Sequence, residues 1–394
     1  MPRLLAALLA LAGGSAFAQP PKPHPSDDVF KPGTVWVVKV TADEAAVKSL
    51  RADPRKYAKC SIKIGDKEYK DVAVHIKGAA GSSRGWDDKP ALTVNVDKNV
   101  KDQTIKGLDK FHLNNSVQDG SYMNEILCSE LARKMNLPTA RAAHAVVELN
   151  GRKVGLYVLK EGYNNSFVRR YFAAAPGGNL YDGGFLQDID ADLKLDSGDA
   201  AGKKADLTAL AKACQEPDAK KRYEAVGKLV DVDLFAANAA LQLLACDWDG
   251  YMRNRNNFRV YFPPDGGKAV FIPHGMDQMF GNPGDALWHG WGGMAARALL
   301  DHPDGKKLVV AKMTEMFYKH MKLDDLHKRV DEWATPAAEA LKAVDKNAPA
   351  GFLNEIKNEK DRLKQRVEYV KKELPKVKVP LEPDAHAQCV EITR

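Results

Sequence analysis

The sequence predicts an α+β protein of two lobes, the first rich in sheet and the second mainly helical. Two observations lead to this division. Between residues 35 and 160, apolar residues alternate or form short β-branched runs, which is typical of strands. From about residue 205 they recur at helical spacing. We therefore divide the 394 residues into a signal segment (1–18), a linker (19–34), an N-terminal lobe (35–160), a C-terminal lobe (161–375) and a tail (376–394).

The N-terminal lobe begins with strand patterns at 36–40, 60–64, 72–76 and 91–96. One helix is predicted to start near Ser121, because apolar residues then recur every three or four positions as far as Met135. Asn136-Leu-Pro138 ends it. The pair Asn150-Gly151 joins two further strand runs, 146–149 and 154–159, into a hairpin, because Asn-Gly is the strongest short turn signal.

The C-terminal lobe contains a strongly apolar run, 231–245, which predicts a buried helix, and long amphipathic patterns over 305–375. Within the C-terminal lobe, an insertion near 183–205 carries an acidic run of five aspartates: 188, 190, 192, 196 and 199. Calcium loops use alternating oxygens, but Leu193 and Leu195 interrupt the pattern and no glutamate closes it. The run therefore favours a solvated insertion over a calcium site.

The first residues read as a secretory signal. Met-Pro-Arg precedes an apolar run, and Ser15-Ala-Phe-Ala18 provides a small-x-small cleavage site. The run is shorter than the roughly 20 residues that span a bilayer, and no later stretch is long enough either. We expect a protein without a transmembrane segment, exported to the periplasm, the cell surface or the medium after cleavage near Ala18.

Composition excludes several classes of function. The net charge is +7, but the lysines are scattered rather than clustered, so no nucleic-acid partner is expected. The five cysteines form no C-x-x-C pair, which argues against a zinc site and against a full disulfide framework. An exported location would still permit one or two bridges.

Two aspartates carry the strongest chemical signal. Asp249 follows the apolar run 231–245 and precedes several asparagines, whereas Asp277 follows the apolar run 269–273. A carboxylate and an amide that face a second carboxylate can hold magnesium against phosphates, because this ion prefers hard oxygen ligands. The two aspartates are 28 residues apart, since 277 − 249 = 28, which suits a hairpin that brings them together. In the alternative interpretation both are turn residues.

The segments around these aspartates resemble the CotH family, the spore-coat-protein-H-like atypical protein kinases. The likeness rests on residues 249–261, on 272–280, on Lys106-Gly-Leu-Asp-Lys-Phe-His-Leu-Asn-Asn-Ser116, and on the Asn-Gly hairpin 149–161. Together these segments span roughly residues 35 to 375. The resemblance implies a two-lobed, atypical protein-kinase-like fold with ATP between the lobes.

The resemblance assigns roles to the aspartates and asparagines. Asp249 would be the catalytic base, or would orient the attacking hydroxyl, with Asp247 close enough to compete for that role. Asp277 resembles the metal aspartate of the kinase Asp-Phe-Gly element, although Gly275-Met276 replaces the pair that is usual in the family. Asn257 is the favoured second magnesium ligand, and Asn254, five residues after Asp249, is the alternative.

The resemblance also suggests a nucleotide site in the N-terminal lobe. Lys89 matches a family lysine before a strand and could bind the phosphates, with Glu125 as a possible ion-pair partner. A surface lysine and a solvated helix carboxylate are the alternatives. Glu161 would lie near adenine or ribose, or simply at the lobe junction.

The small-residue segment 78–85 could cover the phosphates with its backbone amides. Ser82, Ser83 and Arg84 would add donors. The match to the family is only partial here, and a flexible hairpin is an equally good interpretation.

The resulting hypothesis is an exported kinase that transfers phosphate from ATP to a protein serine or threonine with Mg²⁺ or Mn²⁺. The alternative is a non-catalytic envelope or surface protein that keeps the fold for binding or scaffolding, since ATP is scarce outside the cytoplasm. Transfer of another group from a nucleotide would use the same residues.

Overall fold

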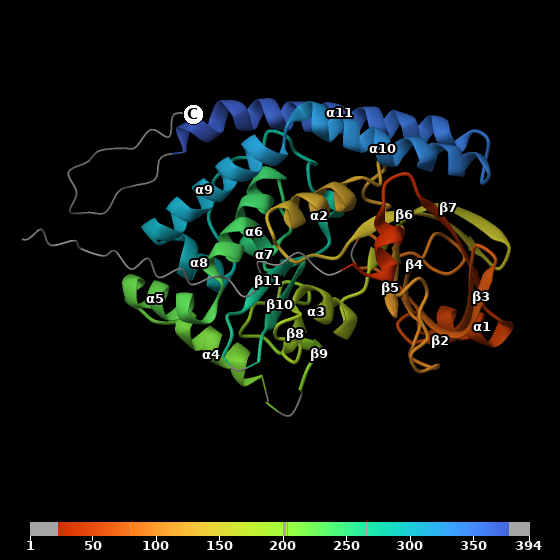
Figure 1. Ribbon diagram of the computed structural model, residues 1–394, viewed down its shortest axis with the longest axis horizontal. Helices are drawn as coiled ribbons and strands as arrows, with labels where there is room; N and C mark the ends of the chain where they lie inside the picture. Colours follow the sequence, from red (N-terminus) through yellow and green to blue (C-terminus); the bar gives the residue numbers. More distant parts are fainter. Residues whose placement is uncertain (1–22, 80, 200–201, 203, 265, 378–394) are drawn as a thin grey trace, which may run out of the picture.

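The computed structural model describes residues 23–79, 81–199, 202, 204–264 and 266–377. The signal segment 1–18, Cys389 and most of the tail 376–394 lie outside these residues. Seven strands close into a barrel in the order β1-β2-β3-β4-β5-β7-β6 (Figure 1). Their bounds are β1(Val35–Thr41), β2(Ala58–Ile64), β3(Lys67–Lys77), β4(Ala91–Asn95), β5(Lys110–Asn114), β6(Ala142–Leu149) and β7(Arg152–Glu161).

Strand β2 of the barrel alternates buried with exposed or partly exposed side chains, whereas β4, β6 and β7 are buried along most of their length. Along β2, Ala58, Cys60, Ile62 and Ile64 are buried, and the residues between them are exposed or partly exposed. Neighbouring strands pair antiparallel, except for β1 and β6, which run parallel and close the barrel. The interior is a separate hydrophobic cluster.

Two helices accompany the barrel. α1(Glu44–Ala52) follows β1 and begins at Asp43, whose side chain accepts a hydrogen bond from the backbone N–H of Ala46. α2(Asn124–Lys134) lies between β5 and β6 in sequence and packs into the larger hydrophobic cluster, together with the C-terminal helices. α2 therefore joins the barrel to the rest of the molecule.

The remaining chain is mixed rather than purely helical. Four strands form a second sheet in the order β11-β10-β8-β9, with bounds β8(Asn179–Asp182), β9(Lys194–Ser197), β10(Phe258–Phe262) and β11(Val270–Pro273). Helices surround it (Figure 1). Their bounds are α3(Asn165–Tyr171), α4(Ala205–Cys214), α5(Ala219–Leu229), α6(Val232–Leu244), α7(Tyr251–Asn254), α8(Met294–Leu300), α9(Pro303–His320), α10(Leu323–Lys342) and α11(Ala348–Glu373).

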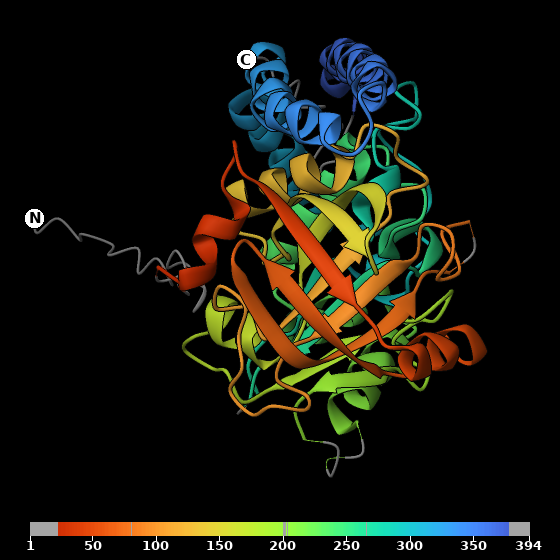
Figure 2. The same ribbon diagram turned by 90° about the vertical axis from the view of Figure 1, so that its right-hand side faces the viewer.

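α10 and α11 extend along one side of the molecule and lie above the barrel in Figure 2. α10 contacts β1, β6 and β7. Arg366 of α11 is fully buried and donates hydrogen bonds to the carbonyl oxygens of Leu243 and Leu244, at the end of α6. Since those carbonyls have no partner within their own helix, Arg366 caps α6 and fixes the chain that leads to Asp249.

The structure confirms a mixed α and β protein and corrects three expectations. The N-terminal sheet is a closed barrel that includes β5 and α1, neither of which was predicted. The predicted linker 19–34 contains a 3₁₀ helix, Pro25–Phe30, in which Ser26 and Val29 are buried. The predicted insertion 183–205 is not fully solvated, because β9 pairs with β8 and the side chain of Asp196 is buried against Arg259.

Within the described residues no helix is long and apolar enough to cross a membrane. The four described cysteines, Cys60, Cys128, Cys214 and Cys246, are free thiols.

Candidate active site

Asp249 is held by the two asparagines that follow it. Its carboxylate accepts hydrogen bonds from Asn256 Nδ2 at 3.1 and 3.2 Å and from Asn257 Nδ2 at 2.9 Å. Its backbone N–H donates to Asp247 Oδ1 at 3.1 Å. Burial raises the pKa of Asp247 to about 7. Asp247 thus positions the loop from inside, and Asp249 is the partly exposed carboxylate of the two.

The backbone of this loop is strained. Cys246, Arg255 and Asn257 have φ of 59°, 54° and 50°, in the left-handed region that non-glycine residues rarely adopt. Such conformations cost about 1–2 kcal/mol each relative to the right-handed form. They persist only where surrounding contacts impose them, and they are common at active sites.

The segment that carries Asp277 lies directly against this loop. The backbone N–H of His274 donates to the Asn257 carbonyl at 2.9 Å. Gly275 has a φ of +60°, and a Cβ at this position would approach Asn257 Oδ1 to 2.5 Å. Only glycine allows the approach, which brings the Asp277 and Asp249 segments together.

A buried ion pair links this segment to α2 and the barrel. Lys160 Nζ, on β7, contacts Glu125 Oε1, on α2, and both side chains are almost completely buried. Glu125 Oε2 accepts a hydrogen bond from the Met276 backbone N–H at 3.0 Å. Lys160 also lies 3.1 Å from His274 Nδ1. Burial and the positive charge of Lys160 hold the pKa of His274 well below its ordinary value, so its neutral ring accepts from Lys160.

Asp277 directly follows Met276, whose backbone binds Glu125 of this pair. Asn124 Nδ2, at the start of α2, donates to its carbonyl oxygen at 3.1 Å. Burial and the nearby Glu125 carboxylate raise the pKa of Asp277 to about 6. The carboxylate forms no ion pair with any described residue and keeps some solvent contact. A carboxylate in this state favours a cation that would replace its proton.

Lys77 is a second lysine of the site, at the end of β3. Its Nζ donates to Asn114 Oδ1 at 2.6 Å and forms no salt bridge with a described residue. Burial, followed by repulsion from Lys160, lowers the pKa of Lys77 to about 7, while Glu125 and Asp277 act in the opposite direction. A partly buried lysine without a carboxylate partner can bind an anionic ligand.

Sequence reasoning missed Lys77 and Lys160. Each follows an apolar run at the end of a strand, and Lys77 directly precedes the 78–85 segment. A charged residue inside a buried strand was the signal that could have identified both, because lysine is almost never fully buried without a partner.

Lys89 and Glu125 do not form the expected pair. Lys89 Nζ contacts the Tyr122 hydroxyl and lies 4.7 and 5.3 Å from the ring centroids of Tyr122 and Tyr157. Burial lowers its pKa to about 8. Glu125 pairs with Lys160 of β7 instead.

The expected phosphate-covering loop starts at the site, directly after Lys77. Ser82 Oγ accepts from the Ala79 N–H at 3.1 Å, and Arg84 donates to the carbonyls of Gly81 and Ser83. These residues, with the neighbouring Ser83, form contacts within their own exposed turn.

Asn254, the alternative metal ligand, donates to the Trp248 carbonyl at 2.8 Å. Its amide therefore supports the loop that carries Asp249.

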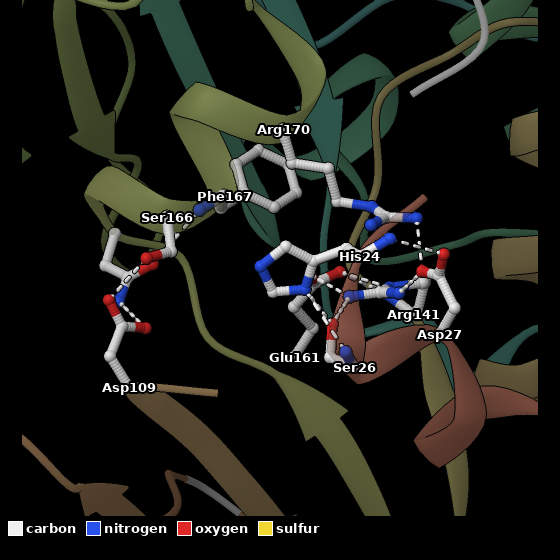
Figure 3. A network of polar contacts seen from close by, with 10 residues as sticks. His24, Ser26, Asp27, Asp109, Arg141, Glu161, Ser166, Phe167 and Arg170 are labelled. Carbon is white, nitrogen blue, oxygen red and sulfur yellow. Dashed lines mark hydrogen bonds and ion pairs between the residues drawn. The ribbon is translucent and has the colours of Figure 1, made fainter. Parts of the chain in front are cut away.

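Glu161 lies at the junction of the barrel with α3, and its carboxylate is fully engaged. Arg141 donates to Glu161 Oε2 at 3.0 Å and to Oε1 at 2.6 Å (Figure 3). Arg141 also binds Asp27 at 2.6 Å, and Arg170 binds Asp27 at 2.8 Å. Both Glu161 oxygens accept from a buried arginine. These contacts favour the alternative that Glu161 marks the junction, and its place near adenine or ribose stays a prediction.

The acidic run is dispersed rather than gathered. Asp188 accepts from the Tyr251 hydroxyl and the Met294 N–H, whereas Asp196 pairs with Arg259. In the described part of the chain, no three acidic, histidine or cysteine side chains come close enough to hold a metal by themselves. Magnesium usually takes one or two carboxylates and completes its shell with water and phosphate oxygens. Asp277 and Asn257 stay the predicted ligands of such a shared site, and the Asn257 amide oxygen faces the glycine at 275.

The comparisons with known proteins agree with the sequence motifs. The model of the CotH kinase protein family matches residues 74–374. No curated protein matches the chain.

Among solved structures, a Helicobacter pylori proinflammatory kinase, CtkA, is 7% identical, with 74% of this chain and 96% of that chain covered and a TM-score of 0.33. The Shewanella oneidensis toxin–antitoxin complex of HipA, HipB and operator DNA is 11% identical, with coverages of 87% and 74% and a TM-score of 0.34. Since the family model covers most of the chain, the protein belongs to the CotH kinase family.

Proposed function

We propose that this protein is an exported kinase that transfers the terminal phosphate of ATP to a serine or threonine hydroxyl of a protein, with Mg²⁺ or Mn²⁺. The observation that carries the proposal is one continuous set of contacts. It runs from Asp249 through Asn257 to the His274–Met276 segment, and from there to the Lys160–Glu125 pair. Protein kinases require a strand lysine, a helix glutamate and a metal aspartate in this kind of proximity.

The charges of the site suit a metal–nucleotide complex. Asp277 and Asn257 would hold the metal ion, which would neutralise charge on the phosphates. Lys77 would face the phosphates, and a bound anion would restore its proton by raising the pKa that burial lowers to about 7. The buried Lys160–Glu125 pair fixes α2, and α2 carries Asn124 against Asp277.

Asp249 would orient the acceptor hydroxyl and receive its proton. The acceptor oxygen attacks the γ-phosphorus, the bond from phosphorus to the ADP oxygen breaks, and ADP departs. The two asparagine amides fix the direction of the Asp249 carboxylate before the substrate arrives. Such positioning lowers the barrier without any covalent intermediate on the protein.

Export is part of the proposal and rests on the signal-like residues 1–18. An exported kinase requires a nucleotide outside the cytoplasm, so the same chemistry would act on a donor present in the envelope or the medium.

Calorimetry on residues 19–394 tests the metal and nucleotide sites. ATP should bind only with a divalent cation, and Asp277→Ala should weaken this binding. Asp190→Ala, a change of an exposed aspartate in the acidic run, is the matched control and should bind as the wild type does. Equal binding by the wild type and Asp277→Ala would remove Asp277 from the metal site.

A further inference from the structure

Large apolar side chains are exposed at seven of the described positions, and three of them lie on two loops, the one after β8 and the one that carries Asp249. Phe185 is 65% exposed, Leu186 46% and Trp248 47%. We call these three residues the apolar rim. The other four are separate, at Val37, Val100, Tyr318 and Leu353. Isolated exposed apolar residues are ordinary, but a group of them at a site indicates an interaction surface.

Strand register brings the chain that leads to Phe185 and Leu186 to the end of β10 that adjoins Asn256 and Asn257. β8 and β10 pair antiparallel with Asp182 opposite Arg259, and the Gly183 N–H continues the ladder to the Phe258 carbonyl at 3.1 Å. The next residues of the loop therefore pass the end of β10, where Asn257 and Asn256 hold the Asp249 carboxylate. Trp248 directly precedes Asp249 in the second loop, so the rim draws on two separate loops.

The first of these loops is anchored at both ends. A Cβ on Gly183 would come within 2.2 Å of the Phe258 ring, so the chain packs tightly at this point. At the other end, Asp188 accepts from the Tyr251 hydroxyl at 2.9 Å and from the Met294 N–H at 2.8 Å. Leu186 has a left-handed φ of 54°. The fold therefore holds Phe185 and Leu186 in solvent, although burial of apolar side chains is favourable.

We propose that the apolar rim receives an apolar side chain of an acceptor polypeptide, close to the hydroxyl that is phosphorylated. This inference rests on the proposed function and specifies its acceptor. Arg255 is exposed beside Asn256, which favours an acidic residue in the same segment. A polypeptide suits the rim better than a sugar, because the rim combines an aliphatic side chain and aromatic rings on two loops with an exposed arginine.

Phosphate transfer to paired peptides tests the rim. One peptide carries a serine with leucine and phenylalanine neighbours and a glutamate, and in its partner alanines replace the two apolar residues. The wild type should use the apolar peptide with a kcat/KM about tenfold higher, the effect of one modest apolar contact. Phe185→Ala/Leu186→Ala should abolish this preference. Tyr318→Ala, an equally exposed aromatic residue on α9, is the matched control and should retain it.

The outcomes separate the two proposals. Equal use of both peptides by the wild type would overturn the proposed role of the rim. A preference that persists in the double variant would overturn it as well. Transfer to oligosaccharides but to neither peptide would also contradict it. Nucleotide binding in the calorimetry above would leave the metal–nucleotide site standing in each of these cases. The absence of nucleotide binding and of any transfer would overturn the proposed function together with the rim.

Discussion

Replacement of Lys160 by methionine should destabilise the protein more than almost any other single lysine change. The Lys160 side chain is 0% exposed and that of its partner, Glu125, is 1% exposed. Methionine fills a similar volume but removes the charge. Glu125 then keeps one hydrogen bond, from the Met276 N–H at 3.0 Å, and a buried negative charge without a partner.

The expected loss is about 3–5 kcal/mol of unfolding free energy, because breaking a buried pair leaves an uncompensated charge. Removing both charges should cost much less. In Lys160→Met/Glu125→Gln neither member of the pair is charged, and such replacements often change the unfolding free energy little. The double variant should therefore be more stable than Lys160→Met by about 2–3 kcal/mol, a coupling expected for residues in contact.

Denaturant unfolding of the wild type, both single variants and the double variant measures this coupling. Lys63→Met, a change of an exposed lysine on β2, is the control and should stay within about 0.5 kcal/mol of the wild type. A loss below about 1 kcal/mol for Lys160→Met, with no recovery in the double variant, would refute the argument that this pair supports the site.

Three further predictions concern the site and its support. Asp249→Asn should reduce transfer of labelled phosphate by on the order of 10²-fold or more while calorimetry shows nucleotide affinity retained, and undiminished transfer would move the base to Asp247. The pKa of Asp277 is raised to about 6, so the affinity for the metal–nucleotide complex should rise about tenfold between pH 5 and pH 7, a dependence that Asp277→Asn should flatten. Since the folded state keeps this proton to higher pH than the unfolded state, the same ionisation should lower unfolding free energy as pH rises from about 4 to 6, and a rise attributable to Asp277 would contradict the assignment. Asp27→Asn weakens the bridge to Arg141 and Arg170 and should lower the free energy of unfolding in denaturant by about 1–2 kcal/mol. Asp28→Asn, a change of the exposed neighbour, should lower it little, and equal effects would exclude a contribution of the bridge to stability.

Local sequence determined the elements with strong periodicity or turn chemistry. The Asn150-Gly151 turn gave the hairpin of β6 and β7, and the apolar run 231–245 became α6. β5 was not predicted, because it has only five residues and lies within the segment 106–116 that resembles the family. β9 was not predicted, because it contains Asp196 of an acidic run that suggested exposure to solvent. A short strand in a polar segment depends on partners elsewhere in the chain, which periodicity does not reveal.

The sequence by itself predicted that Asp249 and Asp277 share one site, because their residue types and spacing suit one metal–phosphate chemistry, and the family resemblance added Asn257. Only the tertiary structure decided which lysines accompany them. Lys89, Lys160 and Lys77 are chemically alike in the sequence, and closure of the barrel places Lys160 against Glu125 and Lys77 near Asp277, but turns Lys89 toward Tyr122. Strand order around a barrel arises from pairing between distant segments, so the choice among equivalent charged residues is a property of the fold and not of any local pattern.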